Sequence, residues 1–324
     1  MVAFFRDKSG VAVFWLIILC FGLHVYSLIN PPHLIVNPNE GFFYYLVSPF
    51  TNLQPYTLAM MYVILIFLTA LQLNFVINDL KMLRKESYTV AAAFLLLSSL
   101  LPAFNQISTA LLACNLLIWI MHGSCRLYNA TNPRPTIYNL GLLTGIAFIL
   151  YYPLLPVVII VLIALVLMRT FRLNEWFVLI FGILTPLYFL VAILFLKDNL
   201  RVLPLPEQLL NLTVPPLKEL PILITTLAVA TAIVLFGVFS VQQDKRDVMQ
   251  VRRSWTVVFV FLIFSIPGVL FIQHAWPTAL LLVMVPASCY TGFTFSDSSR
   301  HIFATISFWA LLALTIYNNW FANY

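Results

Sequence analysis

Apolar runs of about twenty residues recur along the whole chain, separated by short polar segments. This spacing is typical of membrane-spanning helices, because about twenty apolar residues in a helix cross the hydrocarbon core of a bilayer. The strands of a membrane β-barrel would instead alternate apolar and polar residues. The pattern therefore predicts an all-α fold, a polytopic bundle of about eleven transmembrane helices. The predicted helices cover residues 11–29, 55–76, 88–104, 107–124, 137–152, 154–169, 176–196, 220–241, 254–272, 276–293 and 302–319.

One apolar segment, Tyr138–Met168, decides the orientation of every later helix. It has 31 residues, and as a single helix it would be ~46 Å long against a hydrocarbon core of ~30 Å. Pro153 and Pro156 lie near its middle. Each proline removes a backbone donor and disfavours helix at the preceding residue. We therefore expect two short helices, joined by a turn that contains Tyr151 and Tyr152.

The distribution of lysine and arginine supports this pair of helices. With two helices around Pro153 and the N-terminus in the cytoplasm, fourteen of the seventeen basic residues fall on the cytoplasmic side, whereas one merged helix would leave ten there. Cytoplasmic loops of membrane proteins are enriched in Lys and Arg. The sequence therefore predicts a cytoplasmic N-terminus and a C-terminus outside.

The composition indicates one integral membrane domain over residues 1–324. Hydrophobic residues make up 62% of the chain and charged residues 9%, against about a quarter charged in soluble domains. The net charge of +6 is accounted for by basic cytoplasmic loops, so we expect the lipid bilayer as a partner and no nucleic acid. Four cysteines without CxxC spacing indicate neither a disulfide framework nor a metal site, and no motif indicates a cofactor.

Glu40 is the acidic residue that we single out on the predicted outer side. It lies in the loop NPNEGFFYYLVSP, where an isolated carboxylate either has a raised pKa or finds a partner, and this makes it a candidate catalytic acid or base. The alternative is a solvated loop carboxylate. A short interfacial helix is expected over residues 40–48. The other candidates lie in the outer segments: His33 as a catalytic residue, and Tyr44, Tyr45, Arg201 and His274 as substrate-binding residues.

Polar residues within the predicted helices are few, and we interpret them as structural. His24 is expected to be a hydrogen-bonded helix residue, and Asn74, Asn115 and Gln72 are expected to form hydrogen bonds between helices. Ion-coupled carriers place ionisable groups near the middle of the membrane. No acidic residue lies deep in a predicted helix, which weighs against such a carrier.

Three central segments carry a resemblance to a known family: LPAFNQISTALLACNLLIWIMHGSCRLYN (101–129), YNLGLLTGIAFILYYPLL (138–155) and LMRTFRLNEWFVLIFGILTPLYFLVAILFL (167–196). They resemble uncharacterised multi-pass membrane proteins of Bacteroidota, a domain of unknown function. The resemblance covers roughly the middle third of the chain. It implies the bacterial inner (cytoplasmic) membrane, and it implies no particular activity.

A weaker likeness rests on the order of three motifs, NEGFFYY (39–45), LPAFNQ (101–106) and GLLTGIA (141–147). They stand where C-type glycosyltransferases that use polyprenyl-phosphate sugars carry an acidic motif, a short outer turn and a glycine-containing helix. The chain departs from that pattern in three ways. Asn39 replaces the first acidic residue, the first outer loop is much shorter, and no soluble outer domain follows.

Three functions remain open from the sequence. We favour a non-catalytic or degenerate relative of membrane glycosyltransferases that acts in cell-envelope assembly together with other envelope membrane proteins. The second is an active glycosyltransferase that takes a polyprenyl-phosphate-linked sugar, with Glu40 as base. The third is a transporter. Whether the protein is an enzyme is therefore left open at this stage.

Overall fold

The computed structural model describes residues 2–31, 41–129, 132–198, 220–244, 248–269, 276–297 and 301–321. These residues form twelve α-helices, several short 3₁₀ turns and no β-strand, which confirms the predicted all-α bundle. Seven of the helices are long and apolar enough to cross a membrane. The bounds are α1 Gly10–Ile29, α2 Phe43–Val47, α3 Pro55–Asp79, α4 Thr89–Ser98, α5 Thr109–Arg126, α6 Pro133–Leu150, α7 Leu155–Met168, α8 Leu173–Leu196, α9 Leu220–Gln243, α10 Met249–Val269, α11 Trp276–Ser296 and α12 His301–Trp320.

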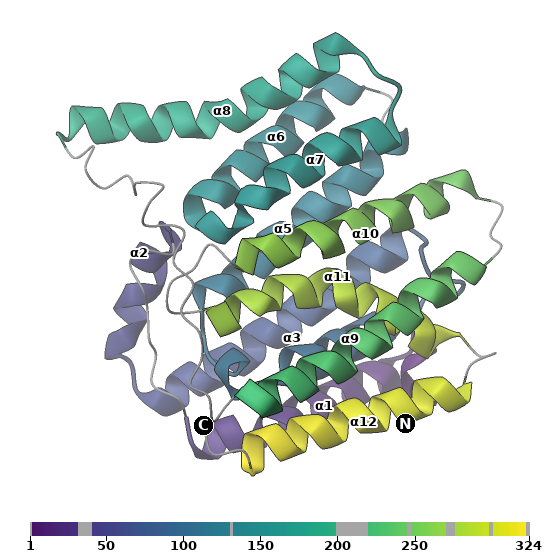
Figure 1. Cartoon of the computed structure of the whole chain (residues 1–324). Helices are drawn as coiled ribbons and strands as arrows, with labels where there is room; N and C mark the ends of the chain where they lie inside the picture. The colour runs from purple at the N-terminus through teal and green to yellow at the C-terminus, as the bar shows by residue number, and fades with distance from the viewer. Residues whose placement is uncertain are drawn as a thin grey trace.

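The helices run back and forth across one bundle (Figure 1). All eleven predicted long helices are present, and the additional α2 is the short helix that was predicted over residues 40–48. The proline-containing segment forms two helices, as predicted: α6 ends at Leu150, a 3₁₀ turn covers Tyr152–Leu154, and α7 starts at Leu155. The sequence therefore predicted the order of these helices correctly.

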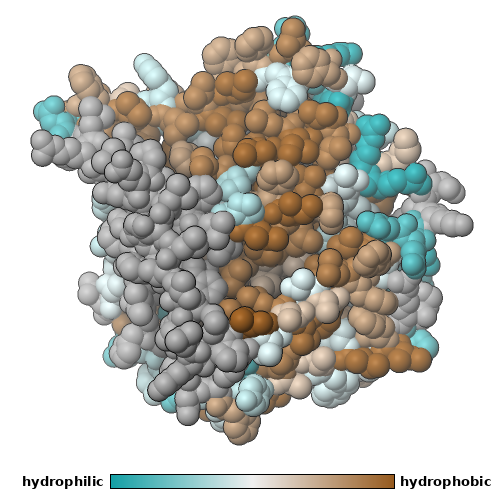
Figure 2. Space-filling view, in the orientation of Figure 1, coloured by the Kyte–Doolittle hydropathy of each residue, from teal (hydrophilic) through white to brown (hydrophobic). Residues whose placement is uncertain are grey.

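Basic residues from alternate loops meet at one end of the bundle, which we call the basic end. Four contacts hold these loops together: Arg6 Nε donates to Phe295 O at 3.0 Å, Lys8 pairs with Glu86 at 2.6 Å, Arg84 pairs with Asp244 at 2.6 Å, and the Arg253 guanidinium lies 5.2 Å from the centre of the Tyr128 ring. In Figure 2 hydrophilic residues gather along the right edge, where this end lies, beside a broad apolar surface. This arrangement is the one that alternating membrane crossings require.

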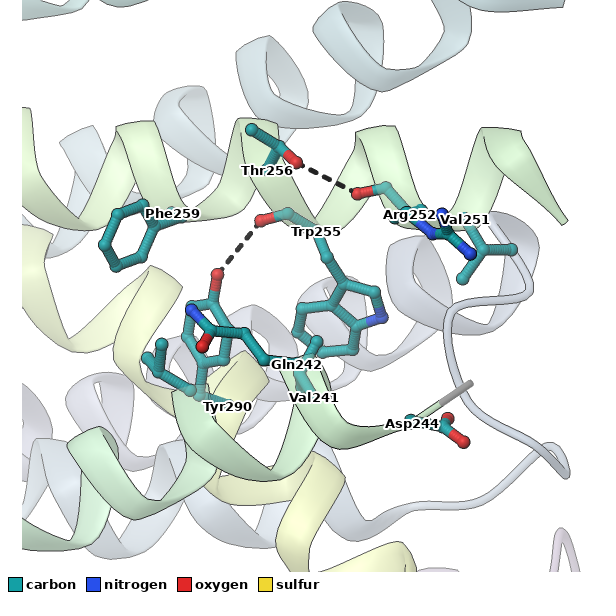
Figure 3. Close-up of a pocket in the computed structure, with 10 residues that line it drawn as sticks. Val241, Gln242, Asp244, Val251, Arg252, Trp255, Thr256, Phe259 and Tyr290 are labelled. Carbon is teal, nitrogen blue, oxygen red and sulfur yellow. Dashed lines mark hydrogen bonds between the residues drawn. The ribbon is translucent and has the colours of Figure 1, made fainter. Parts of the chain in front are cut away.

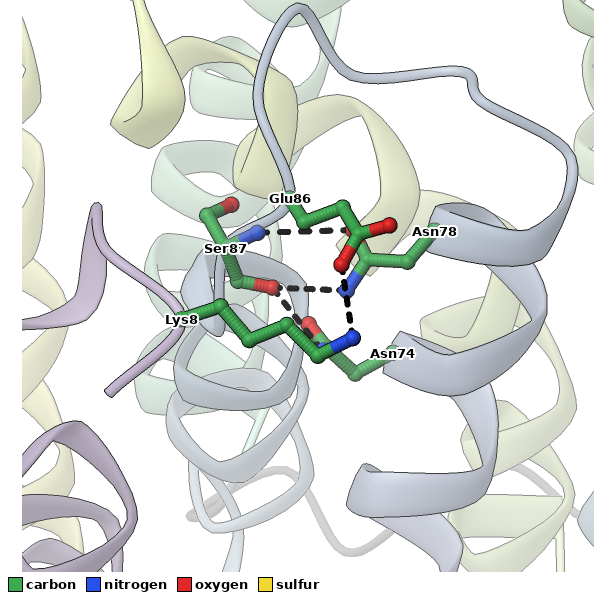
Figure 4. Close-up of polar contacts among 5 residues, drawn as sticks. All are labelled: Lys8, Asn74, Asn78, Glu86 and Ser87. Carbon is green, nitrogen blue, oxygen red and sulfur yellow. Dashed lines mark hydrogen bonds and ion pairs between the residues drawn. The ribbon is translucent and has the colours of Figure 1, made fainter. Parts of the chain in front are cut away.

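The connection between α3 and α4 is fastened at the basic end by an ion pair and two asparagines (Figure 4). Lys8 and Glu86 are both exposed, and their hydrogen bond and opposite charge raise the pKa of Lys8. Asn74 and Asn78 of α3 donate to the carbonyl of Ser87, at 2.9 and 3.0 Å. Exposed ion pairs contribute little to stability, so the asparagines are the main attachment. Asn74 Oδ1 also accepts from the backbone N–H of Ala91 in α4 at 3.3 Å, which confirms the predicted hydrogen bond between helices.

Helix α4 forms the centre of the bundle, since each of its ten residues is buried. It ends at Ser98, so the prediction of a helix over residues 88–104 is wrong in its length. Pro102 has no N–H to donate to the carbonyl of Ser98, four residues earlier, and the hydroxyl of Ser99 donates back to Leu95 O at 2.8 Å. At 1.5 Å per residue, α4 spans only ~15 Å, about half of a hydrocarbon core. Non-helical backbone therefore follows α4 inside the protein, where side chains must satisfy it.

Candidate functional site at the tyrosine end

The end opposite the basic end carries helix α2 and the turn between α6 and α7, and we call it the tyrosine end. Two of the predicted binding residues, Tyr44 and Tyr45, lie here on α2. Their rings meet edge to face with centroids 5.4 Å apart, and Tyr45 is 60% exposed. Four predicted site residues lie outside the described residues, and their roles stay predictions: Glu40, His33, Arg201 and His274.

Gly41 fastens the start of α2 to the end of α6. Its φ of +129° suits glycine, and a Cβ at this position would lie 2.5 Å from the carbonyl oxygen of Leu150. The next residue, Phe42, donates its backbone N–H to Ile149 O at 3.3 Å. The residue that directly follows Glu40 is therefore held against the α6–α7 turn.

The C-terminal end of α10, more than a hundred residues further along the chain, contacts the same α6–α7 turn. A Cβ on Gly268 would lie 2.5 Å from the carbonyl oxygen of Pro153, so glycine is what permits this approach. Gly268 precedes His274 by six residues. Gly41, which follows Glu40, and Gly268 of α10 therefore both contact this turn.

Aromatic side chains line the turn itself. Tyr151 is fully buried, and Tyr152 is 8% exposed with its ring 6.0 Å from that of Phe148. Tyrosine combines an apolar ring with a hydroxyl that forms hydrogen bonds, which suits both membrane interfaces and protein interfaces. The described part of this end is therefore suited to binding a partner or an amphiphile.

A buried polar network behind this end was not recognised in the sequence. It starts where α4 stops, because the carbonyls after α4 accept hydrogen bonds from two asparagines of α12. Asn319 Nδ2 donates to Ser99 O at 3.0 Å, and Asn318 Nδ2 donates to Leu100 O at 2.8 Å. The signal in the sequence is two adjacent asparagines near the end of a mostly apolar helix. These side chains supply the partners that the interrupted backbone needs.

The same network continues to α1 and α3. Asn105 Nδ2 donates to Asn319 Oδ1 at 2.8 Å, and the Tyr62 hydroxyl lies 3.5 Å from Asn105 Oδ1 and 3.3 Å from His24 Nε2. His24 Nδ1 lies 2.7 Å from the Cys20 carbonyl. A carbonyl only accepts, so Nδ1 carries the proton and Nε2 accepts from Tyr62. The prediction that His24 is a hydrogen-bonded helix residue is confirmed.

Comparison with known proteins gives one match. The sequence profile of one protein family, described as "Family of unknown function (DUF6427)", matches residues 38–317. No curated protein and no solved structure matches the chain. The match covers most of the chain. Within the described ranges, no group of three or more His, Cys, Asp or Glu side chains is placed to hold a metal ion.

Proposed function

We propose that this chain, which belongs to the Family of unknown function (DUF6427), is a non-catalytic membrane subunit that offers its tyrosine end to another protein of the cell envelope. The observation that carries the proposal is the placement of α2. Tyr45 is 60% exposed, yet α2 is fastened to the α6–α7 turn through Gly41. An exposed aromatic surface that is already rigid loses little freedom on binding, and tyrosine is enriched in protein interfaces.

The proposal includes a sidedness and a location. We place the basic end in the cytoplasm and the tyrosine end outside, because basic loops mark the cytoplasmic side of membrane proteins. This orientation is supported by the contacts at the basic end. There, Arg6, Lys8 and Arg84 join loops that are far apart in the sequence. The bacterial inner membrane is the location that fits it, with the tyrosine end facing the envelope.

An active glycosyltransferase is the second candidate, and one observation favours it. Gly41, which directly follows Glu40, and Gly268 of α10 both approach the α6–α7 turn. In this alternative, Glu40 acts as a general base towards an acceptor hydroxyl, and the donor is a polyprenyl-phosphate-linked sugar from the outer leaflet. Two features count against this alternative: Asn39 stands where the glycosyltransferase motif has an acidic residue, and the first outer loop is short.

One experiment separates the two candidates. A photo-crosslinking amino acid is placed at position 45, with position 188 as control, because Tyr188 is also an exposed tyrosine but lies on α8. A subunit predicts one abundant membrane-protein adduct at position 45 and none at 188, and Tyr45→Ala should prevent copurification of that partner. Glu40→Gln should leave the adduct unchanged.

The glycosyltransferase candidate is tested by the amount of polyprenyl-linked sugars in the cells. Mass spectrometry of polyprenyl-linked sugars is carried out on a deletion strain carrying either the native gene or Glu40→Gln. A subunit predicts the same pool in both strains. If a lipid-linked sugar accumulates on deletion, and Glu40→Gln fails to clear it at normal protein abundance, the protein is a transferase and the subunit proposal is wrong.

A further inference from the structure

The buried polar network behind the tyrosine end contains more hydrogen-bond acceptors than donors. It lies between the end of α4 and the last turn of α12, on the same side of the bundle as α2 (Figure 1). Asn318 and Asn319 of α12 are 1% and 4% exposed, so bulk solvent does not solvate their amides. The polar atoms of this network therefore depend on partners inside the protein.

The Asn318 amide leaves its oxygen without a donor. Its Nδ2 donates to Leu100 O at 2.8 Å and to Thr226 Oγ1 at 2.9 Å. The opposite orientation of the amide would place Oδ1 against the Leu100 carbonyl, and neither of those oxygens can donate. The contact with Leu100 therefore fixes which amide atom faces away from it. No described residue donates to Asn318 Oδ1, although this oxygen is buried.

A second acceptor, Asn105 Oδ1, competes with a histidine for one proton. The Tyr62 hydroxyl donates to His24 Nε2 at 3.3 Å, and Asn105 Oδ1 lies 3.5 Å from the same hydroxyl oxygen. A hydroxyl carries one proton, so Tyr62 satisfies only one of these two acceptors. The buried Tyr290 differs, because its hydroxyl donates at 2.9 Å to the carbonyl of Trp255 (Figure 3). The shortage of donors is therefore a feature of the surroundings of Tyr62.

The backbone after α4 adds a third acceptor. Ser98 is fully buried, and its carbonyl lacks the usual helical donor because Pro102, four residues later, has no N–H. The next two carbonyls, those of Ser99 and Leu100, accept from α12 at 3.0 and 2.8 Å. The Ser98 carbonyl thus needs a donor that its own helix does not supply.

We propose that this network binds water in the protein interior, with water molecules that donate to Asn318 Oδ1 and Asn105 Oδ1. Water suits the site because one molecule donates two hydrogen bonds and can therefore satisfy two acceptors. A metal cation would also be attracted to these oxygens. However, the described hydrogen bonds of the network involve no carboxylate, and an unpaired buried charge is costly. The inference goes beyond the proposed subunit role, since it concerns the interior of the bundle.

X-ray hydroxyl-radical footprinting of the purified full-length protein tests the proposal. Radicals formed from bound water oxidise the buried side chains beside it, whereas radicals from bulk solvent reach exposed side chains. Tyr62 and Leu100 are 0% and 1% exposed, and both should be oxidised. Phe308 is the control, because it is also 0% exposed and lies on α12, but its neighbours are two other phenylalanine rings. Phe308 should stay unmodified.

Two variants locate the water at Asn318. Asn318→Leu replaces the amide by an apolar group of similar size, and the oxidation of Leu100 should be lost. Asn74→Leu is the matched control: Asn74 is 2% exposed, but its amide donates to Ser87 O and accepts from the Ala91 N–H. This control should leave the oxidation of Leu100 unchanged. A single peak in gel filtration shows that each variant is folded, and the native protein alone decides between Tyr62 and Phe308.

Four outcomes would overturn the proposal. If Tyr62 and Leu100 are as unreactive as Phe308, the network is dry. If Leu100 remains oxidised in Asn318→Leu, or loses its oxidation equally in Asn74→Leu, Asn318 does not hold the water. If the native protein melts at a lower temperature when choline replaces sodium and potassium at constant ionic strength, a metal cation occupies the network in place of water.

Discussion

Replacing Asn319 by alanine tests whether α12 supports the interrupted backbone after α4. The side chain joins three elements: its Nδ2 donates to Ser99 O at 3.0 Å, and its Oδ1 accepts from Asn105 Nδ2 at 2.8 Å. Asn319 is 4% exposed, and so is Asn105. Alanine therefore leaves a carbonyl and an amide without these partners in the protein interior.

The expected loss follows from the two hydrogen bonds between elements. Hydrogen bonds between membrane helices contribute ~0.6 kcal/mol on average and up to ~1.7 kcal/mol, and an unsatisfied buried polar group costs ~1–3 kcal/mol. We expect Asn319→Ala to lower the free energy of unfolding by about 2 kcal/mol. Asn319→Asp should cost more, because a carboxylate cannot donate to Ser99 O and its charge would be buried.

Reversible unfolding from mild detergent into SDS, followed by far-UV circular dichroism, measures these differences. Thr305→Ala is the matched control on the same helix, because the Thr305 hydroxyl is exposed and bonds only to His301 O within α12. This control should stay within ~0.5 kcal/mol of the native protein. The reasoning is refuted if Asn319→Ala unfolds like Thr305→Ala, since the backbone after α4 would then not depend on α12.

Three further changes probe other contacts. Gly141→Leu should destabilise the protein by ~1–3 kcal/mol in thermal unfolding, because a Cβ there would lie 2.6 Å from a carbonyl oxygen of α8, whereas Gly22→Leu has open space and should cost nothing. Glu175→Ala should lower the free energy of SDS unfolding by ~2 kcal/mol, since it leaves the mostly buried Arg169 without its 2.9 Å ion-pair partner; an unchanged midpoint would contradict this. Gly41→Ala should strain the backbone by ~1–3 kcal/mol and speed amide hydrogen exchange in α2, while α3 exchanges at the native rate. Unchanged exchange in α2 would show that Gly41 does not hold α2 against the end of α6.

Much of the fold could be predicted because a few local signals determine it. The apolar runs set the number of helices, and Pro153 and Pro156 split the central segment, since proline acts within its own turn of the chain. Gln72 and Asn115 were each expected to form hydrogen bonds between helices, and they do so with one another, with Gln72 Nε2 donating to Asn115 O at 3.1 Å. Each of these signals is contained in a short stretch of sequence.

The interior of the bundle could not be predicted in the same way. An all-apolar helix has the same pattern whether it faces lipid or protein, so nothing marked α4 as the buried centre. The partners of the backbone after α4 are remote: Asn319 lies 220 positions beyond Ser99. Of the predicted site residues, Tyr44 and Tyr45 lie together on α2, and the other four fall outside the described ranges.

The orientation of the bundle is the claim on which the proposed subunit role depends, and cysteine labelling tests it directly. The four native cysteines are all buried, so a membrane-impermeant maleimide should react mainly with introduced thiols. Tyr45→Cys reports on the tyrosine end and Lys85→Cys, at an exposed position, on the basic end. We predict that Tyr45→Cys is labelled in intact cells, and that Lys85→Cys is labelled only after the cells are opened. The reverse pattern would place the tyrosine end in the cytoplasm and contradict the account.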